Sequence, residues 1–155
     1  MEKIPQHNII ERLRSENIWW DSKFSVPSQY EQYRPRPYLD IFYPIVNNRS
    51  VQRAIVFMGP RRVGKTVLLH HTIKRLIADG VDPQKICYIS VDHPLYNGLT
   101  LESFMDAFQE ATRINYKTQE CFVFFDEIQY MKEWEVYLKQ LVDKNRSIKC
   151  VVSGS

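Results

Sequence analysis

The stretch that decides the fold is Gly59-Pro60-Arg61-Arg62-Val63-Gly64-Lys65-Thr66. It fits the pattern G-x-x-x-x-G-K-[ST], in which a glycine-rich loop wraps around phosphate groups. An apolar run of strand length, residues 54–58, precedes the loop, and residues 67–73 have the composition of a helix. Strand, glycine-rich loop and helix is the context that this motif requires. The stretch therefore predicts a phosphate-binding loop between a strand and a helix.

Each position in this loop has a chemical task. Gly59 and Gly64 lack a Cβ, so the backbone can approach a ligand and point its N–H groups at phosphate oxygens. The following helix adds the positive end of its dipole. We expect Lys65 to neutralise the β and γ phosphates and to assist catalysis, and the Thr66 hydroxyl to bind Mg²⁺. The residues expected to contact the nucleotide are Gly59, Pro60, Arg61, Arg62, Val63, Gly64, Lys65, Thr66 and Val67.

A second landmark is the pair Asp126-Glu127, which ends the uniformly apolar run 121–125. Such a run is typical of a central parallel strand that is buried on both faces. Downstream of a phosphate loop, an acid in this place holds Mg²⁺, so Asp126 is predicted to bind the metal through water. Glu127 is predicted to polarise the attacking water as a general base. The alternative is an acidic helix start, which the helix dipole would favour.

Composition limits the class of protein. The chain has 155 residues, 44% of them hydrophobic, and a net charge of +3, which is enough for one domain with a core and too weakly basic to indicate nucleic acid. No apolar run approaches the roughly 20 residues of a membrane span, and the first six residues hold no signal-peptide core. Cys87, Cys121 and Cys150 lie in predicted strands without metal-ligand spacing, which favours core packing and a reducing, cytoplasmic location.

The residues before the loop predict a helical and irregular segment, residues 1–50, ahead of a core over residues 51–155. Residues 4–20 have helical periodicity, and Trp19 and Trp20 are interpreted as core residues. From Phe24 to Pro44 the chain is rich in tyrosine and proline, with a helix resuming over residues 38–46. This segment either packs over the edge of the sheet or lines a pocket for the base.

Further elements complete an alternating pattern of strands and helices. Strands are expected over residues 86–91 and 148–152, and amphipathic helices over residues 101–114, with Thr100 as N-cap, and 128–142. His70 and His71 are interpreted as ordinary helix residues. Asp92 follows a strand at the edge where ligands bind in open α/β sheets. The predicted class is therefore α/β, a three-layer fold with a mainly parallel sheet of four core strands.

With both landmarks placed, the sequence resembles the AAA+-type P-loop ATPases of bacteria and archaea, most of unknown physiological role. The resemblance rests on residues 59–66 (GPRRVGKT), 124–129 (FFDEIQ) and 152–155 (VSGS), and covers most of residues 38–155. It implies that the strand around Val151 lies between the P-loop strand and the Asp126 strand. It also implies that Ser153 or Ser155 senses the γ phosphate through its hydroxyl.

Members of that family continue past this point to a fifth strand, an arginine-bearing region and a helical lid. The resemblance therefore implies a truncated core whose P-loop strand lies at an exposed sheet edge. No cis arginine is identified for the phosphates, because Arg61 and Arg62 lie in the loop itself and can equally contact phosphate, a neighbouring subunit or solvent.

Three functions fit these observations. The first is Mg²⁺-dependent binding and hydrolysis of ATP, where ATP over GTP rests on the resemblance. The second is an ATP-binding switch or scaffold with little turnover that acts through a protein partner or self-association. The third is a small-molecule kinase. Glu127 makes a kinase the weakest of the three, because a kinase must keep water from attacking the phosphate and a general base would activate that water. Nucleic-acid binding and membrane insertion are not supported.

Overall fold

The computed structural model describes residues 4–21 and 26–155. Phe24, at the start of the predicted aromatic and proline-rich segment, lies outside the described residues, as do Met1 to Lys3 of the first six residues. The described chain contains four strands, β1 (Ile55–Met58), β2 (Ile86–Ser90), β3 (Cys121–Asp126) and β4 (Ile148–Gly154). All are parallel and run in the order β1-β4-β3-β2, so β4 lies between β1 and β3 as the resemblance implied.

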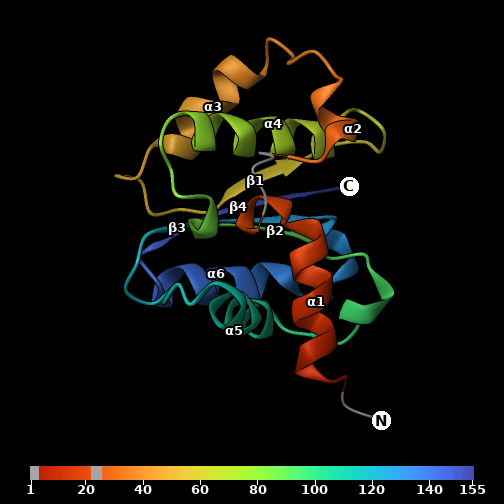
Figure 1. The fold of residues 1–155 in the computed structure, drawn as a ribbon, viewed down its shortest axis with the longest axis vertical. Coiled ribbons are helices and arrows are strands. Elements are labelled where there is room, and N and C mark those ends of the chain that lie inside the picture. Colours follow the sequence, from red (N-terminus) through yellow and green to blue (C-terminus); the bar gives the residue numbers. More distant parts are fainter. Residues whose placement is uncertain (1–3, 22–25) are drawn as a thin grey trace.

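Helices cover both faces of this sheet, which makes the molecule three layers thick (Figure 1). On one face lie α2 (Ser28–Glu31), α3 (Leu39–Asn47) and α4 (Lys65–Ala78). On the other lie α5 (Leu101–Thr112) and α6 (Trp134–Lys144), with α1 (Gln6–Glu16) crossing beside α5. The α/β class and the parallel sheet predicted from the sequence are confirmed. None of the helices in the described parts of the chain is long and apolar enough to cross a bilayer.

The burial of each element follows its sequence pattern. Every residue of β3 is buried, as expected for a strand covered on both faces. On α5, Leu101, Phe104, Met105 and Phe108 recur at helical spacing and face the core, and the Thr100 hydroxyl accepts the Ser103 N–H as a cap. The three cysteines are free and buried in the strands, which confirms their interpretation as core residues.

Two of the predicted helices are interrupted in the structure, and the ends of several other elements shift by one or two residues. The helix predicted over residues 128–142 is interrupted: a short 3-10 turn, Ile128–Tyr130, is followed by α6 from Trp134. Glu133 adopts a left-handed conformation with φ 57°, which redirects the chain so that Leu138 and Leu141 reach the core. Similarly, α1 ends at Glu16, and the two tryptophans lie in a separate 3-10 turn over residues 18–20.

The outer edge of β2 is covered by side chains from residues 16–20. Asn17 accepts the Tyr88 N–H through Oδ1 (2.6 Å) and donates to the Tyr88 carbonyl through Nδ2 (2.8 Å). Trp19 and Trp20 both donate Nε1–H to the Ile86 carbonyl, at 2.9 and 2.7 Å. The tryptophans are therefore core residues, as predicted, and they also supply hydrogen bonds that an adjacent strand would otherwise provide.

β1 forms the opposite edge, and among the described residues it pairs only with β4. The side chains of Val56 and Met58 are 49% and 42% exposed there. On its inner side, Phe57 packs against Tyr38 and Phe42 of the aromatic segment, at ring-centroid distances of 5.6 and 5.5 Å. The strand that leads into the phosphate loop is thus held by α3 and β4.

Candidate nucleotide site

The loop between β1 and α4 has the backbone that the motif requires. Arg62 and Gly64 both adopt left-handed conformations, with φ of 63° and 88°, while α4 begins at Lys65. Left-handed residues within such a turn direct backbone N–H groups toward one side, where they form a concave site for anions. A Cβ at Gly64 would also lie 3.2 Å from the guanidinium carbon of Arg36, so a side chain there would push that group aside.

The ammonium group of Lys65 lies over this loop. Lys65 is only 6% exposed, and its Nζ donates to the carbonyls of Gly59 (2.6 Å) and Pro60 (2.5 Å). No ion pair with a carboxylate is formed by Lys65 within the described chain. A lysine ammonium has three protons to donate, so one remains for an anion. The loop thus holds a nearly buried positive charge without a carboxylate partner among residues 4–21 and 26–155.

Asp126 lies at the end of β3, where three other elements meet it. Its Oδ2 accepts from the hydroxyls of Thr66 on α4 (2.7 Å) and Tyr88 on β2 (2.5 Å). Its Oδ1 accepts from Ser153 Oγ on β4 (2.5 Å) and from the Glu127 N–H (3.0 Å). Burial and the charge of Asp126 raise the pKa of Tyr88 well above its usual value, so this phenol remains a donor.

Glu127 sits in a left-handed conformation, φ 56°, at the turn after β3. Its Oε2 accepts from Gln129 Nε2 at 2.5 Å, and the same nitrogen donates to Ser155 Oγ at 3.1 Å. Gln129 Oε1 in turn accepts the Ser155 N–H at 3.2 Å. Gln129 also packs so tightly on Gly154 that a Cβ there would collide with its side-chain oxygen. Gln129 therefore links the predicted general base to the end of β4.

A group of stacked aromatic side chains contacts the backbone of Thr66 through His70. The His70 ring stacks on Tyr30 with a centroid distance of 3.9 Å and contacts Tyr88 at 4.3 Å. Its Nδ1 lies 2.9 Å from the Thr66 carbonyl, which can only accept, so this nitrogen carries the proton. Burial lowers the pKa of His70 to about 4, which leaves the imidazole neutral at pH 7. His70 is therefore a packing and hydrogen-bonding residue of the site.

Beside the loop lies a cavity of about 410 Å³. Part of its wall is aromatic and apolar, and part is cationic, while none of its described lining residues is a carboxylate. The aromatic and apolar side chains include Tyr33, Tyr38, Phe57, Val67 and Leu68, and the cations are Arg34, Arg36 and Arg62. Cavities of this size with apolar walls and a few placed charges suit small-molecule ligands. The aromatic segment therefore both packs on β1 and lines a cavity that could receive a base.

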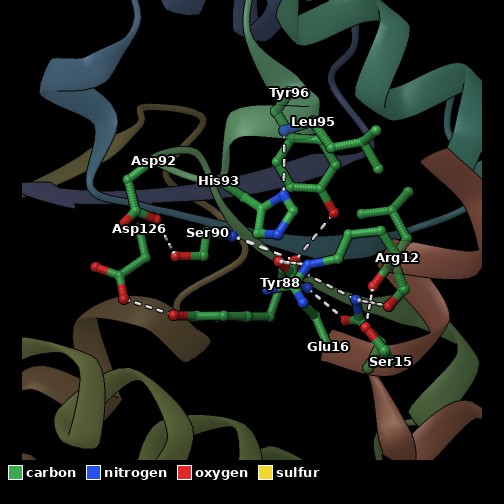
Figure 2. Close-up of polar contacts among 12 residues, drawn as sticks. Arg12, Ser15, Glu16, Tyr88, Ser90, Asp92, His93, Leu95, Tyr96 and Asp126 are labelled. Carbon is green, nitrogen blue, oxygen red and sulfur yellow. Dashed lines mark hydrogen bonds and ion pairs between the residues drawn. The ribbon is translucent and has the colours of Figure 1, made fainter. Parts of the chain in front are cut away.

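On the other side of Asp126, α1 meets the end of β2 (Figure 2). Glu16 is held there by Arg12 Nε (3.1 Å), the Ser90 N–H (3.3 Å) and the Tyr96 hydroxyl (3.3 Å). Burial raises the pKa of Glu16 to about 7. Asp92 lies at the edge of this group and accepts from Ser90 Oγ at 2.6 Å. Asp92 thus occupies the predicted edge of the sheet and serves there to bind a neighbouring hydroxyl.

The predicted site residues gather at the carboxyl edge of the sheet, with differing contacts. Arg61 donates to the Tyr130 hydroxyl at 3.4 Å, while Val63 is 42% exposed and lines the cavity beside the loop. The register places Ser153 of β4 opposite Phe57 of β1, next to the loop. The residues brought together around the loop and the strand ends are Gly59, Pro60, Gly64, Lys65, Thr66, Val67, Asp126, Glu127 and Ser153.

A comparison with models of known protein families identifies the family of this chain. A family model described as an AAA domain matches residues 51–155. The chain belongs to the AAA domain family. This AAA domain is a P-loop fold of the nucleotide-binding kind, and the resemblance inferred from the motifs is confirmed.

A relative of this AAA domain protein is an uncharacterized protein of the archaeon Methanocaldococcus jannaschii. The two are 29% identical over 131 residues, which is 83% of this chain and 27% of that protein. The chain thus spans about a quarter of the length of the curated relative that it matches.

Sequence reasoning missed three residues that contact the loop or the two acids: Tyr88, Gln129 and Arg36. Tyr88 sits inside a strand pattern, where a tyrosine usually signals packing. Gln129 was quoted only as part of a motif. Arg36 is the second arginine of Arg34-Pro35-Arg36-Pro37, a run whose alternation of cation and proline was the one available signal.

Proposed function

We propose that this chain binds ATP together with Mg²⁺ and hydrolyses it. The observation that carries the proposal is the 2.7 Å contact between Thr66 Oγ1 and Asp126 Oδ2, which joins the loop to the end of β3 across 60 positions of sequence. A hydroxyl and a carboxylate at this spacing are hard oxygen ligands of the kind Mg²⁺ selects. The Thr66 hydroxyl would bind the ion, and the carboxylate that accepts a hydrogen bond from this hydroxyl would hold the ion through water, so the two side chains can serve one Mg²⁺.

The small number of protein oxygens at the site also matches what Mg²⁺ requires in a phosphoryl-transfer site. No group of three histidine, cysteine or carboxylate side chains that could hold a metal occurs among the described residues. Mg²⁺ in phosphoryl-transfer sites needs only one or two protein oxygens, because water and phosphate oxygens complete its shell. When bound, the ion would offset the negative charge of the phosphates. Thr66 and Asp126 would hold it.

The remaining roles follow from position. The loop N–H groups and Lys65 would bind the phosphates, with the Lys65 ammonium exchanging a backbone carbonyl for phosphate oxygen. Ser153, which now donates to Asp126 Oδ1, would keep that carboxylate oriented and lie within reach of the same site. Glu127 would accept a proton from water. The cavity lined by Tyr38 and Phe57 would receive the base by stacking.

A second candidate function, ATP binding with little turnover, is favoured by one contact. Gln129 occupies Oε2 of Glu127 at 2.5 Å, so the carboxylate is engaged before any water is bound. With this function the protein would act as a switch, and a protein partner would bind one of its two states, with ATP or without it. The same residues bind ATP in both versions, and only the fate of the bound ATP differs.

Calorimetric titration with ATP, with and without Mg²⁺, tests binding, and phosphate release tests turnover. We expect Mg²⁺-dependent binding that Lys65→Ala weakens by about 10–100-fold, the value of a charge-assisted hydrogen bond. Glu127→Gln should retain binding and lower hydrolysis by about 10²–10⁴-fold. Hydrolysis retained in Glu127→Gln would remove the general-base role. Binding without measurable hydrolysis in the wild-type chain would favour the switch.

A further inference from the structure

The described residues that line the cavity beside the loop carry positive charge and include no carboxylate. Arg34, Arg36 and Arg62 line it, and none of them forms an ion pair within the described chain. Five basic side chains elsewhere in the described chain form ion pairs with acids, namely Arg12, Arg14, Arg49, Lys74 and Arg75. An uncompensated cluster of guanidinium groups beside aromatic rings suits a ligand that is both anionic and flat.

Arg36 differs from its neighbours because it contacts the loop itself. Its Nη1 donates to the Val63 carbonyl at 2.9 Å. Its guanidinium carbon lies 3.2 Å from where a Cβ on Gly64 would stand, so the group rests directly on the glycine. Arg36 is thus placed against the part of the loop whose N–H groups should face phosphate.

The chain around Arg36 holds it in this place. Pro35 and Pro37 restrict the backbone on both sides, which lowers the entropy lost when the side chain is fixed. Two residues later Leu39 is 7% exposed and starts α3, and the Tyr38 ring packs on Phe57 of β1. The segment is therefore anchored to the strand that leads into the loop. Arg36 itself precedes residues 51–155, the part that the AAA domain model matches.

We propose that Arg36 is a phosphate ligand of the bound nucleotide, supplied from outside the matched AAA domain; this rests on the proposed function. A guanidinium has five N–H donors, and the bond to Val63 uses one of them. The others can bind phosphate oxygens in pairs, a geometry that lysine cannot reproduce. In the structure, Arg36 binds the loop through the Val63 carbonyl. With nucleotide bound, the free N–H groups of the same side chain bind the phosphate oxygens.

The test compares three variants of this chain by calorimetric titration with ATP, ADP and inorganic tripolyphosphate. Arg36→Ala should weaken all three by about 10–100-fold, because a charge-assisted contact to phosphate is lost. Arg36→Lys should fall between, since it keeps the charge without the fork. The matched control is Arg53→Ala, which removes the same charge from an exposed position away from the cavity and should stay within about twofold.

Several outcomes would overturn this role. Arg36→Ala that binds as Arg53→Ala does would show that the guanidinium touches no phosphate. A loss for ATP and ADP without a loss for tripolyphosphate would make Arg36 a support of the base cavity. Binding lost in Lys65→Ala but kept in Arg36→Ala would overturn the role of Arg36 alone. Wild-type protein that binds none of the three probes would overturn the proposed function as well.

Discussion

Asp126 receives four hydrogen bonds from the protein, although it is only 1% exposed. A carboxylate so far from water is tolerated only when donors replace the water that it has lost. Three of these donors are hydroxyls, from Thr66, Tyr88 and Ser153, and each can turn its proton elsewhere when a competing cation arrives. The acid is thus ready to exchange partners without any movement of the backbone.

Tyr88→Phe tests the value of one of these donors. The change removes the hydroxyl that bonds to Asp126 Oδ2 and leaves the ring in place against His70. Hydrogen bonds to charged groups contribute about 1.5–3 kcal/mol, so we expect the free energy of unfolding to fall by about that amount in urea titration. The control is Tyr137→Phe, which removes a hydroxyl from a 39% exposed ring. Equal losses in the two variants would contradict the prediction.

The site residues that could be predicted from the sequence are those whose position depends only on neighbouring residues in the chain. Lys65, Thr66 and Asp126 are identifiable because loop spacing and the end of a strand place them whatever the rest of the chain does. Tyr88 and Arg36 are not, because their roles depend on which strands are neighbours and on where a segment outside the motif crosses the loop. The specific roles of the predicted residues, Glu127 and Ser153 above all, stay predictions.

Between α1 and β2, side chains form the backbone hydrogen bonds that a fifth strand would form at that edge of the sheet. The outward-facing groups of Ile86 and Tyr88 are met by the indoles of Trp19 and Trp20 and by the amide of Asn17. Asn17 is fully buried and also bonds to the Leu13 carbonyl, at the end of its own helix. One side chain therefore ends α1 and attaches it to the sheet.

Asn17→Ala should be strongly destabilising. It would leave the buried N–H and carbonyl of Tyr88 without these partners, each at a cost of about 1–3 kcal/mol. We expect a loss of about 2–5 kcal/mol in the free energy of unfolding, and no rescue in Asn17→Asp, because its second carboxyl oxygen would face the Leu13 and Tyr88 carbonyls without a proton to donate. The reference is Asn97→Ala, at an exposed asparagine. A loss below about 1 kcal/mol in Asn17→Ala would mean that water or a neighbour takes over both bonds.

Whether a segment is a helix or a strand was predictable where the hydrophobic periodicity is strong. The residues at which these elements begin and end were not. The helix at residues 101–112 and the four strands carry clear patterns of apolar residues. The predicted helix over residues 128–142 was wrong because its apolar stripe continues in register across a left-handed residue, Glu133, that has no glycine to signal it. The division of the chain at residue 50 stays a prediction.

Across the whole molecule, a buried carboxylate should make stability depend on pH. Glu16 has a side chain that is 6% exposed, faces Arg12, Tyr96 and Cys87, and has a pKa raised by burial from 4.5 to about 7. Because the folded protein binds this proton more tightly than the unfolded chain, the contribution to stability is present below pH 4.5 and is lost as the pH rises to about 7.

Glu16→Gln should remove this dependence. Relative to wild type, the variant should gain up to about 3 kcal/mol between pH 4.5 and pH 8, which is the pKa difference converted to free energy. Chemical denaturation at a series of pH values measures this gain. Glu110→Gln, at an exposed position on α5, should leave the profile unchanged. A constant difference between Glu16→Gln and wild type at all pH values would contradict the prediction.

The cover on β2 also has a consequence for the order in which the chain matures. Asn17 bonds to a residue 71 positions later, and Trp19 to one 67 positions later. Contacts that close such long loops form late, after local helices and turns. During synthesis the first helix therefore leaves the ribosome long before its place on the sheet exists. The segment with the two tryptophans is thus made before β2 but docks only after it, because the carbonyl that both indoles bind belongs to that strand.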